Sequence, residues 1–159
     1  MRLFWRKAPI MGFAAAVLAV TAPASATTGT AFSSTFQNTS SVTKSFRQAD
    51  GNTFISQTVQ VVYAGELSGP AVEYIDIVVH PDGSLNAKGK DVCACTLAGT
   101  GRSGTIGLAF SGTGDATAFV SGRFVFTGGT GGLAGMHGVG TFEANGSSGP
   151  FSGSYHFEP

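Results

Sequence analysis

The chain has 159 residues, including 24 glycines and 13 phenylalanines, and its nine Lys and Arg residues balance nine Asp and Glu residues. Charged residues make up only 11% of the chain, and they form no basic cluster. Because phosphate binding requires clustered Lys and Arg side chains, the sequence excludes nucleic acid as an expected partner.

The first 26 residues have the three parts of a secretory signal peptide. Three basic residues precede an almost wholly apolar run at 10–22, and Ala24 and Ala26 provide the small side chains before a cleavage site. The apolar run is shorter than the roughly 20 residues that a membrane-spanning helix needs. We therefore expect cleavage after Ala26, a secreted or periplasmic location and no stable membrane insertion. Cleavage would leave six basic against nine acidic residues, a mildly acidic chain.

Residues 27–159 are predicted to form one all-β domain. Segments with alternating apolar and polar positions recur along the chain and are separated by Gly-rich turns, which is typical of a sandwich or barrel. We predict a polar loop at 37–52 and strands at 28–36, 53–63, 71–80, 85–97, 105–111, 116–126, 138–144 and 150–157. Since every connection except the first is short, consecutive strands should pair as hairpins and close into a single antiparallel barrel of about eight strands in meander order.

Alternation also predicts which side chains face the lumen, because residues i, i+2 and i+4 of a strand share a face. We take the apolar face of each strand as the inner one. The polar residues on this face are Gln57, Tyr63, Glu73, Asp91 and Tyr155. Gln57, Tyr63, Glu73 and Tyr155 are our candidate ligand-binding residues. Arg123, His156 and Glu158 should face water.

Glu73 is the best candidate for a catalytic residue. A carboxylate on an otherwise apolar strand face must be paired, protonated or placed at the rim of the barrel. In a dry lumen the pKa of Glu73 would rise, which suits proton abstraction. The alternative is a position at the rim near residues 65–70, where Glu73 reaches solvent or Arg102.

Cys93 and Cys95 are two residues apart on a predicted strand, with Cα atoms about 6.6 Å apart, at the upper edge of disulfide reach. An exported protein meets oxidising conditions, so a disulfide is one interpretation and two free buried thiols are the other. We predict no metal site, because no second Cys or His pair completes a set of three or four ligands. We predict no cofactor, and we expect the three histidines at the surface.

Four segments of the second half carry a resemblance to a known family. They are GRSGTI at 101–106, FVF at 124–126, GGTGGLAGMHGVGTF at 128–142 and GSYHFE at 153–158. Together they resemble a bacterial family of domains of unknown function that is related to the allene oxide cyclase-like barrels and, more distantly, to plant dirigent barrels. The resemblance implies an eight-stranded barrel with a central cavity. It carries over no catalytic residue, because no catalytic position of the cyclases matches here.

Three functions are consistent with these features. The first is an exported barrel that binds a small hydrophobic molecule in its lumen, or serves as a structural module. The second is a cofactor-independent isomerase or cyclase in the manner of the related barrels, which would fold a flexible apolar substrate away from water. The third is an eight-stranded outer-membrane barrel, which the polar outer face disfavours. A homo-oligomer is compatible with each.

Overall fold

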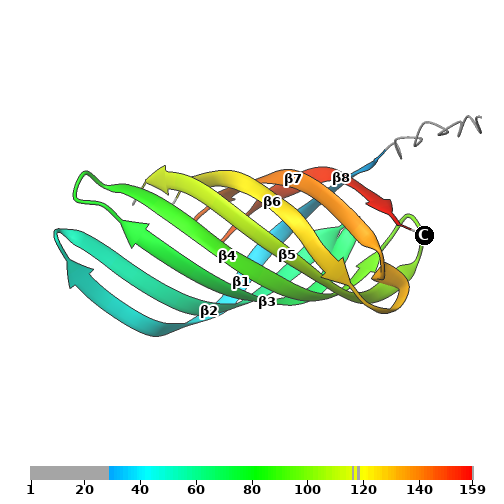
Figure 1. Cartoon of the computed structure of the whole chain (residues 1–159), viewed down its shortest axis with the longest axis horizontal. Coiled ribbons are helices and arrows are strands. Elements are labelled where there is room, and N and C mark those ends of the chain that lie inside the picture. The colour runs from blue at the N-terminus through cyan, green and yellow to red at the C-terminus, as the bar shows by residue number, and fades with distance from the viewer. Residues whose placement is uncertain (1–28, 116, 118, 159) are drawn as a thin grey trace, which may run out of the picture.

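The computed structural model describes residues 29–115, 117 and 119–158 (Figure 1). Eight antiparallel strands follow one another around one sheet, and the last strand pairs with the first to close it into a barrel. The elements are β1 (Thr30–Ala49), β2 (Asn52–Gly65), β3 (Leu67–Val79), β4 (Ser84–Leu97), β5 (Arg102–Asp115), β6 (Phe119–Gly129), the 3-10 helix η1 (Gly131–Leu133), β7 (Met136–Asn145) and β8 (Ser148–Phe157). The predicted all-β class, strand number and meander order are confirmed. The predicted signal peptide at 1–26 lies outside the described residues.

The predicted polar loop at 37–52 is wrong, because β1 continues through this segment to Ala49 and the chain turns only at Asp50 and Gly51. β8 pairs with β1 as far as Gln37, so the rest of β1 pairs with β2 alone. From Thr39 to Gln48 the side chains on both faces of this extension are exposed, and no apolar alternation is needed there. Two register shifts against β2 further disturb the pattern.

One end of the barrel is packed solid. It is the end where the β2–β3, β4–β5 and β6–β7 connections lie, and its fully buried side chains are Leu67, Leu97, Ile106, Leu133 and Met136. Leu133 belongs to η1, which packs against β5. These side chains fill the lumen at this end, and the hydrophobic effect stabilises their burial.

Inward-facing glycines make room for phenylalanine rings. A Cβ atom at Gly89 would lie 2.6 Å from Cζ of Phe110, well inside van der Waals contact. A Cβ atom would come similarly close to a ring at three other positions: Gly122 faces the Phe142 ring, Gly138 the Phe126 ring and Gly140 the Phe124 ring. These four glycines are thus a packing requirement of the aromatic lumen.

Candidate functional site

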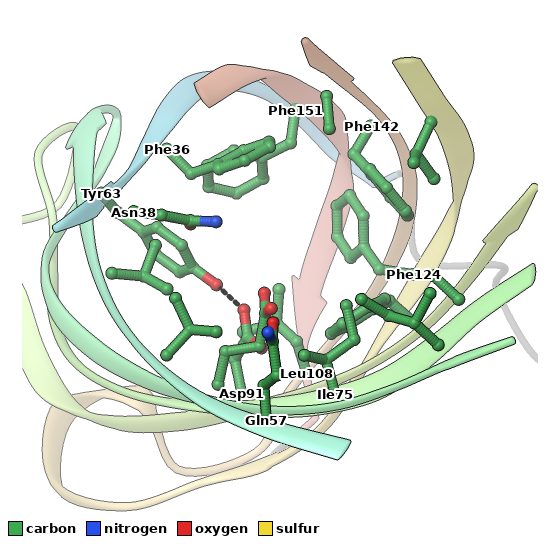
Figure 2. Close-up of a pocket in the computed structure, with 18 of the residues that line it drawn as sticks. Phe36, Asn38, Gln57, Tyr63, Ile75, Asp91, Leu108, Phe124, Phe142 and Phe151 are labelled. Atoms are coloured by element: carbon green, nitrogen blue, oxygen red, sulfur yellow. Dashed lines mark hydrogen bonds between the residues drawn. The ribbon is translucent and has the colours of Figure 1, made fainter. Parts of the chain in front are cut away.

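The lumen holds a cavity of about 280 Å³ beyond the packed end. Its volume is near the lower end of the range of about 300–1,000 Å³ that ligand pockets occupy, so it suits a small molecule. Most of the wall is aliphatic or aromatic, and Figure 2 shows its rings gathered around an open centre. The phenylalanines of the wall are Phe36, Phe110, Phe124, Phe142 and Phe151.

Tyr63, Glu73 and Asp91 bring three ionisable groups to this apolar wall from three neighbouring strands. Asp91 on β4 lies directly opposite Glu73 on β3 in the strand register. The Tyr63 hydroxyl on β2 donates a hydrogen bond to Oδ2 of Asp91 (Figure 2). The Tyr63 ring packs 4.9 Å from the Phe151 ring, centroid to centroid, which fixes the direction of the hydroxyl.

Only one of the two carboxyl oxygens of Asp91 has a hydrogen-bond partner. Its side chain is 6% exposed, and its second oxygen, Oδ1, is buried without a hydrogen-bond partner. Buried polar atoms nearly always have a partner, and an unpaired charged one is costly. The amide oxygen of Asn38, which also lines the cavity, is a second buried acceptor without a partner.

Burial makes both carboxyls hard to ionise. Burial and then the nearby charge of Asp91 raise the pKa of Glu73 to about 8. Burial raises the pKa of Asp91 to about 6, although the hydrogen bond from Tyr63 acts in the opposite direction. Burial and the two acids raise the pKa of Tyr63 above its usual value. No Lys, Arg or His among the described residues that line the cavity opposes these shifts, and of the two acids Asp91, with the lower pKa, is the first to ionise as the pH rises.

The structure places three of the four candidate ligand-binding residues at the cavity, namely Gln57, Tyr63 and Glu73. Tyr155 faces the interior as expected but does not line the cavity. It is 7% exposed and packs in the core, with its ring centroid 6.1 Å from Phe32 and 5.9 Å from Phe157. Its position near the end of β8, opposite Thr30 and Gly138, puts it toward the packed end.

The contact between Glu73 and Arg102 that the rim alternative allowed is not found. Glu73 lines the cavity, and the guanidinium of Arg102 lies 4.2 Å from the centroid of the Phe157 ring instead. Sequence reasoning missed Phe36 and Asn38 as wall residues, the latter because it fell in the predicted loop. Asp91 was predicted to face inward but was not chosen for the site, although its alternation with the apolar positions at 93, 95 and 97 could have selected it.

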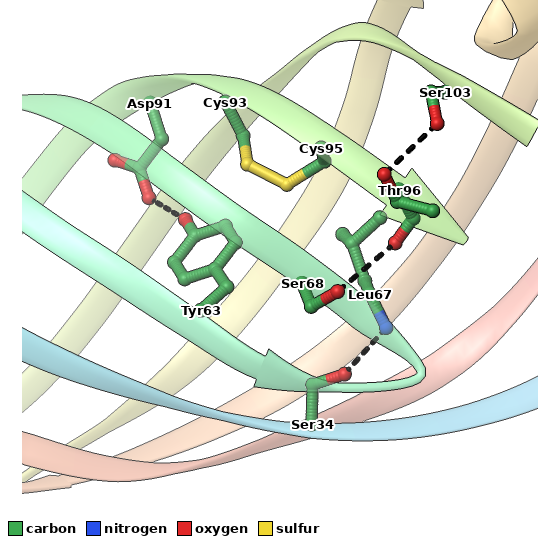
Figure 3. Close-up of a disulfide and its surroundings, with 9 residues drawn as sticks. All are labelled: Ser34, Tyr63, Leu67, Ser68, Asp91, Cys93, Cys95, Thr96 and Ser103. Carbon is green, nitrogen blue, oxygen red and sulfur yellow. Dashed lines mark hydrogen bonds between the residues drawn. A yellow bond between two sulfur atoms is a disulfide. The ribbon is translucent and has the colours of Figure 1, made fainter. Parts of the chain in front are cut away.

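Cys93 and Cys95 form a disulfide on the inner face of β4 (Figure 3). Their Cα atoms are 5.3 Å apart, closer than in a flat strand, and both side chains are at most 2% exposed. The disulfide follows Asp91 along the strand toward the packed end and does not line the cavity. It therefore belongs to the floor beneath the Asp91 carboxyl.

The histidines take no part in this site. His80 hydrogen-bonds the side chains of Asn52 and Asn86, both at 2.7 Å, and His137 stacks on His156 with ring centroids 5.9 Å apart. Within the described part of the chain, no group of three or more His, Cys, Asp or Glu side chains could hold a metal ion. Among the same residues, no helix has the length and apolar character to cross a membrane.

A family model described as "Protein of unknown function (DUF3224)" matches residues 32–158, which include nearly all of the barrel. The chain belongs to the DUF3224 family. This confirms the expected membership of a family of domains of unknown function. The crystal structure of a DUF3224 protein of unknown function from Shewanella oneidensis MR-1 is similar, with a TM-score of 0.70 and 17% sequence identity over 83% of this chain and 100% of that chain. At this identity the likeness establishes a common DUF3224 fold. No curated protein matches the chain.

Proposed function

We propose that this DUF3224 protein is exported and binds a small hydrophobic ligand in the lumen of its barrel. The observation that carries the proposal is the cavity of about 280 Å³ with its wall of phenylalanines. Protein interiors are normally packed with few voids larger than a water molecule, and the lining of a void loses dispersion contacts. The other end of the same barrel is filled by fully buried side chains, so a ligand that fills the open part best explains the cavity.

Two further features support export. The pattern of residues 1–26 is that of a signal peptide. The disulfide between Cys93 and Cys95 is of a kind that persists in oxidising compartments. We also propose that the barrel is related to the allene oxide cyclase-like barrels, on the strength of the glycine-rich hairpin at 128–142 and the final aromatic strand.

Isomerisation of an apolar substrate is a second candidate function, and Glu73 is the observation that favours it. A carboxyl with a pKa of about 8 can accept and return a proton near neutral pH. Tyr63 and Asp91 lie beside it to stabilise charge that develops on a substrate. Such an enzyme needs the same occupied lumen, so ligand binding is the property to test first.

The binding test uses N-phenyl-1-naphthylamine, a neutral dye whose fluorescence rises in apolar surroundings. We expect saturable binding of one dye per chain and displacement by 1-octanol. Ala87→Phe and Ala144→Phe each add a ring to the cavity wall and should abolish binding, whereas Ala64→Phe, at an exposed position of β2, should leave it unchanged. Equal dye binding by the wild type and both lumen variants, with normal far-UV circular dichroism, would contradict the proposal.

Export is tested separately by producing the full chain in a Gram-negative host. The expected result is a periplasmic protein whose intact mass corresponds to a chain beginning at Thr27. A chain that stays in the cytoplasm with residues 1–26 attached would refute export without bearing on ligand binding.

A further inference from the structure

The unpartnered oxygen of Asp91 indicates which group a ligand must bring. Asp91 is more than nine-tenths buried, it lines the cavity, and Oδ1 accepts no hydrogen bond. An ionised carboxylate is an acceptor only, so the missing partner must be a hydrogen-bond donor. Tyr63 bonds the other oxygen, no Lys, Arg or His is among the described residues of the wall, and neither Glu73 nor Gln57 hydrogen-bonds Oδ1 in the structure. The remaining source of a donor is the contents of the cavity.

Glu73 adds a second acidic group at the same place. It is the cross-strand neighbour of Asp91, so the two carboxyls converge on one part of a wall that is otherwise apolar. Two acids without a basic partner disfavour each other's ionisation, and a bound cation would relieve this repulsion. In surroundings of low dielectric constant such an attraction is far stronger than in water.

We infer that the lumen selects hydrophobic primary amines, with the ammonium group bound by Asp91 and Glu73 and the apolar part against the phenylalanine wall. The inference rests on the proposed function and specifies the ligand of the same cavity. An ammonium group has three donors, which suit the free oxygen of Asp91 and the carboxyl of Glu73 together. A neutral alcohol of the same shape offers one donor and no charge, and hydrogen bonds between ionised partners are about twice as strong as neutral ones.

Binding should also release protons. Burial raises the pKa of Glu73 to about 8, Asp91 is the first of the two acids to ionise, the pKa of Tyr63 is raised, and no basic residue of the described wall faces them. A nearby ammonium lowers the pKa of Glu73, so part of its proton leaves when the amine binds. Isothermal titration in buffers of different ionisation enthalpy measures this release, which we expect between zero and one proton per amine and absent for the alcohol.

The test compares 4-phenylbutylamine with 4-phenylbutan-1-ol as competitors of the dye at pH 7.5. We expect the amine to bind at least tenfold more tightly than the alcohol. Asp91→Asn keeps an acceptor for Tyr63 and removes the charge, and it should weaken amine binding at least tenfold while alcohol binding stays within threefold. Glu73→Gln should act in the same direction and carries the test if Asp91→Asn does not fold. Asp76→Asn, which removes an exposed charge from β3, is the matched control and should bind both probes normally.

The outcomes separate the two proposals. If the dye and the alcohol bind but the amine binds no more tightly than the alcohol, the amine inference is overturned and the hydrophobic lumen stands. Amine binding that survives both Asp91→Asn and Glu73→Gln would also overturn it. If neither the dye nor either probe binds, the proposed function fails, and this inference fails with it.

Discussion

Glu73→Gln should stabilise the protein at high pH and change its stability little at low pH. The pKa of Glu73 is about 8 in the folded chain, against a reference value of 4.5. Because the folded state holds this proton more tightly than the unfolded state, the stability linked to it is fully present below about pH 4.5 and is lost as the pH rises through about 8. At about 1.36 kcal/mol per pKa unit, the complete loss is about 4–5 kcal/mol. Glutamine cannot ionise, so the variant escapes this loss.

Water that reaches the partly exposed Glu73 reduces the effect, and we expect the variant to gain about 2–4 kcal/mol relative to the wild type between pH 4 and pH 9. Urea unfolding followed by far-UV circular dichroism at pH 4, 7 and 9 measures the free energy of unfolding of both proteins. Glu143→Gln, the same change at an exposed position of β7, is the control and should show no such trend. A stability difference between Glu73→Gln and the wild type that is the same at pH 4 and pH 9 would refute the reasoning, because it would mean that the Glu73 carboxylate is well solvated.

Three further predictions concern the wall and floor of the cavity. Gly140→Ala should destabilise the barrel by about 1–3 kcal/mol because its methyl group meets the carbonyl oxygen of Ser152 and the Phe124 ring, whereas Gly99→Ala, with open space around it, should be neutral in the same urea assay. In Asp91→Asn, the pKa of Glu73 measured by ¹³C NMR should fall below about 8 yet stay above 4.5, because the neighbouring charge is gone and burial remains; an unchanged pKa would mean that the two acids are not coupled. Reducing the disulfide of β4 should lower the free energy of unfolding by only about 1–2 kcal/mol, because it closes a very short loop, and a loss above about 4 kcal/mol would contradict this.

The eight strands could be predicted because each strand buries its inner face wherever the barrel is closed. Apolar residues therefore occupy alternate positions of the strand there. The same rule failed for β1, where residues 39–48 are exposed on both faces and their polar side chains resemble a loop. The sequence pattern also does not show how far along the barrel axis each inward-facing residue lies. Alternation places Tyr155 and Tyr63 equally inside, but only strand register tells that Tyr155 lies toward the packed end and Tyr63 at the cavity.

The pairing of Asp91 with Tyr63 and Glu73 was also beyond sequence reasoning, because it depends on the cross-strand register of three strands. Alternation gave the face of each residue but not its height along the barrel axis. The inner position of Gln57, in contrast, follows directly from its place between apolar neighbours two residues away on either side.

The long β1 extension leaves one side of a strand without a neighbour. Beyond Asn38, whose N–H donates to the carbonyl oxygen of Ser147, no described strand pairs with this edge. Such an edge is a template for strand addition from another molecule, and hence for aggregation. The chain counters this with the two register shifts that distort the edge and with the exposed charges of Lys44 and Arg47. The irregularities that hid this strand from sequence analysis therefore also protect the protein from polymerising through it.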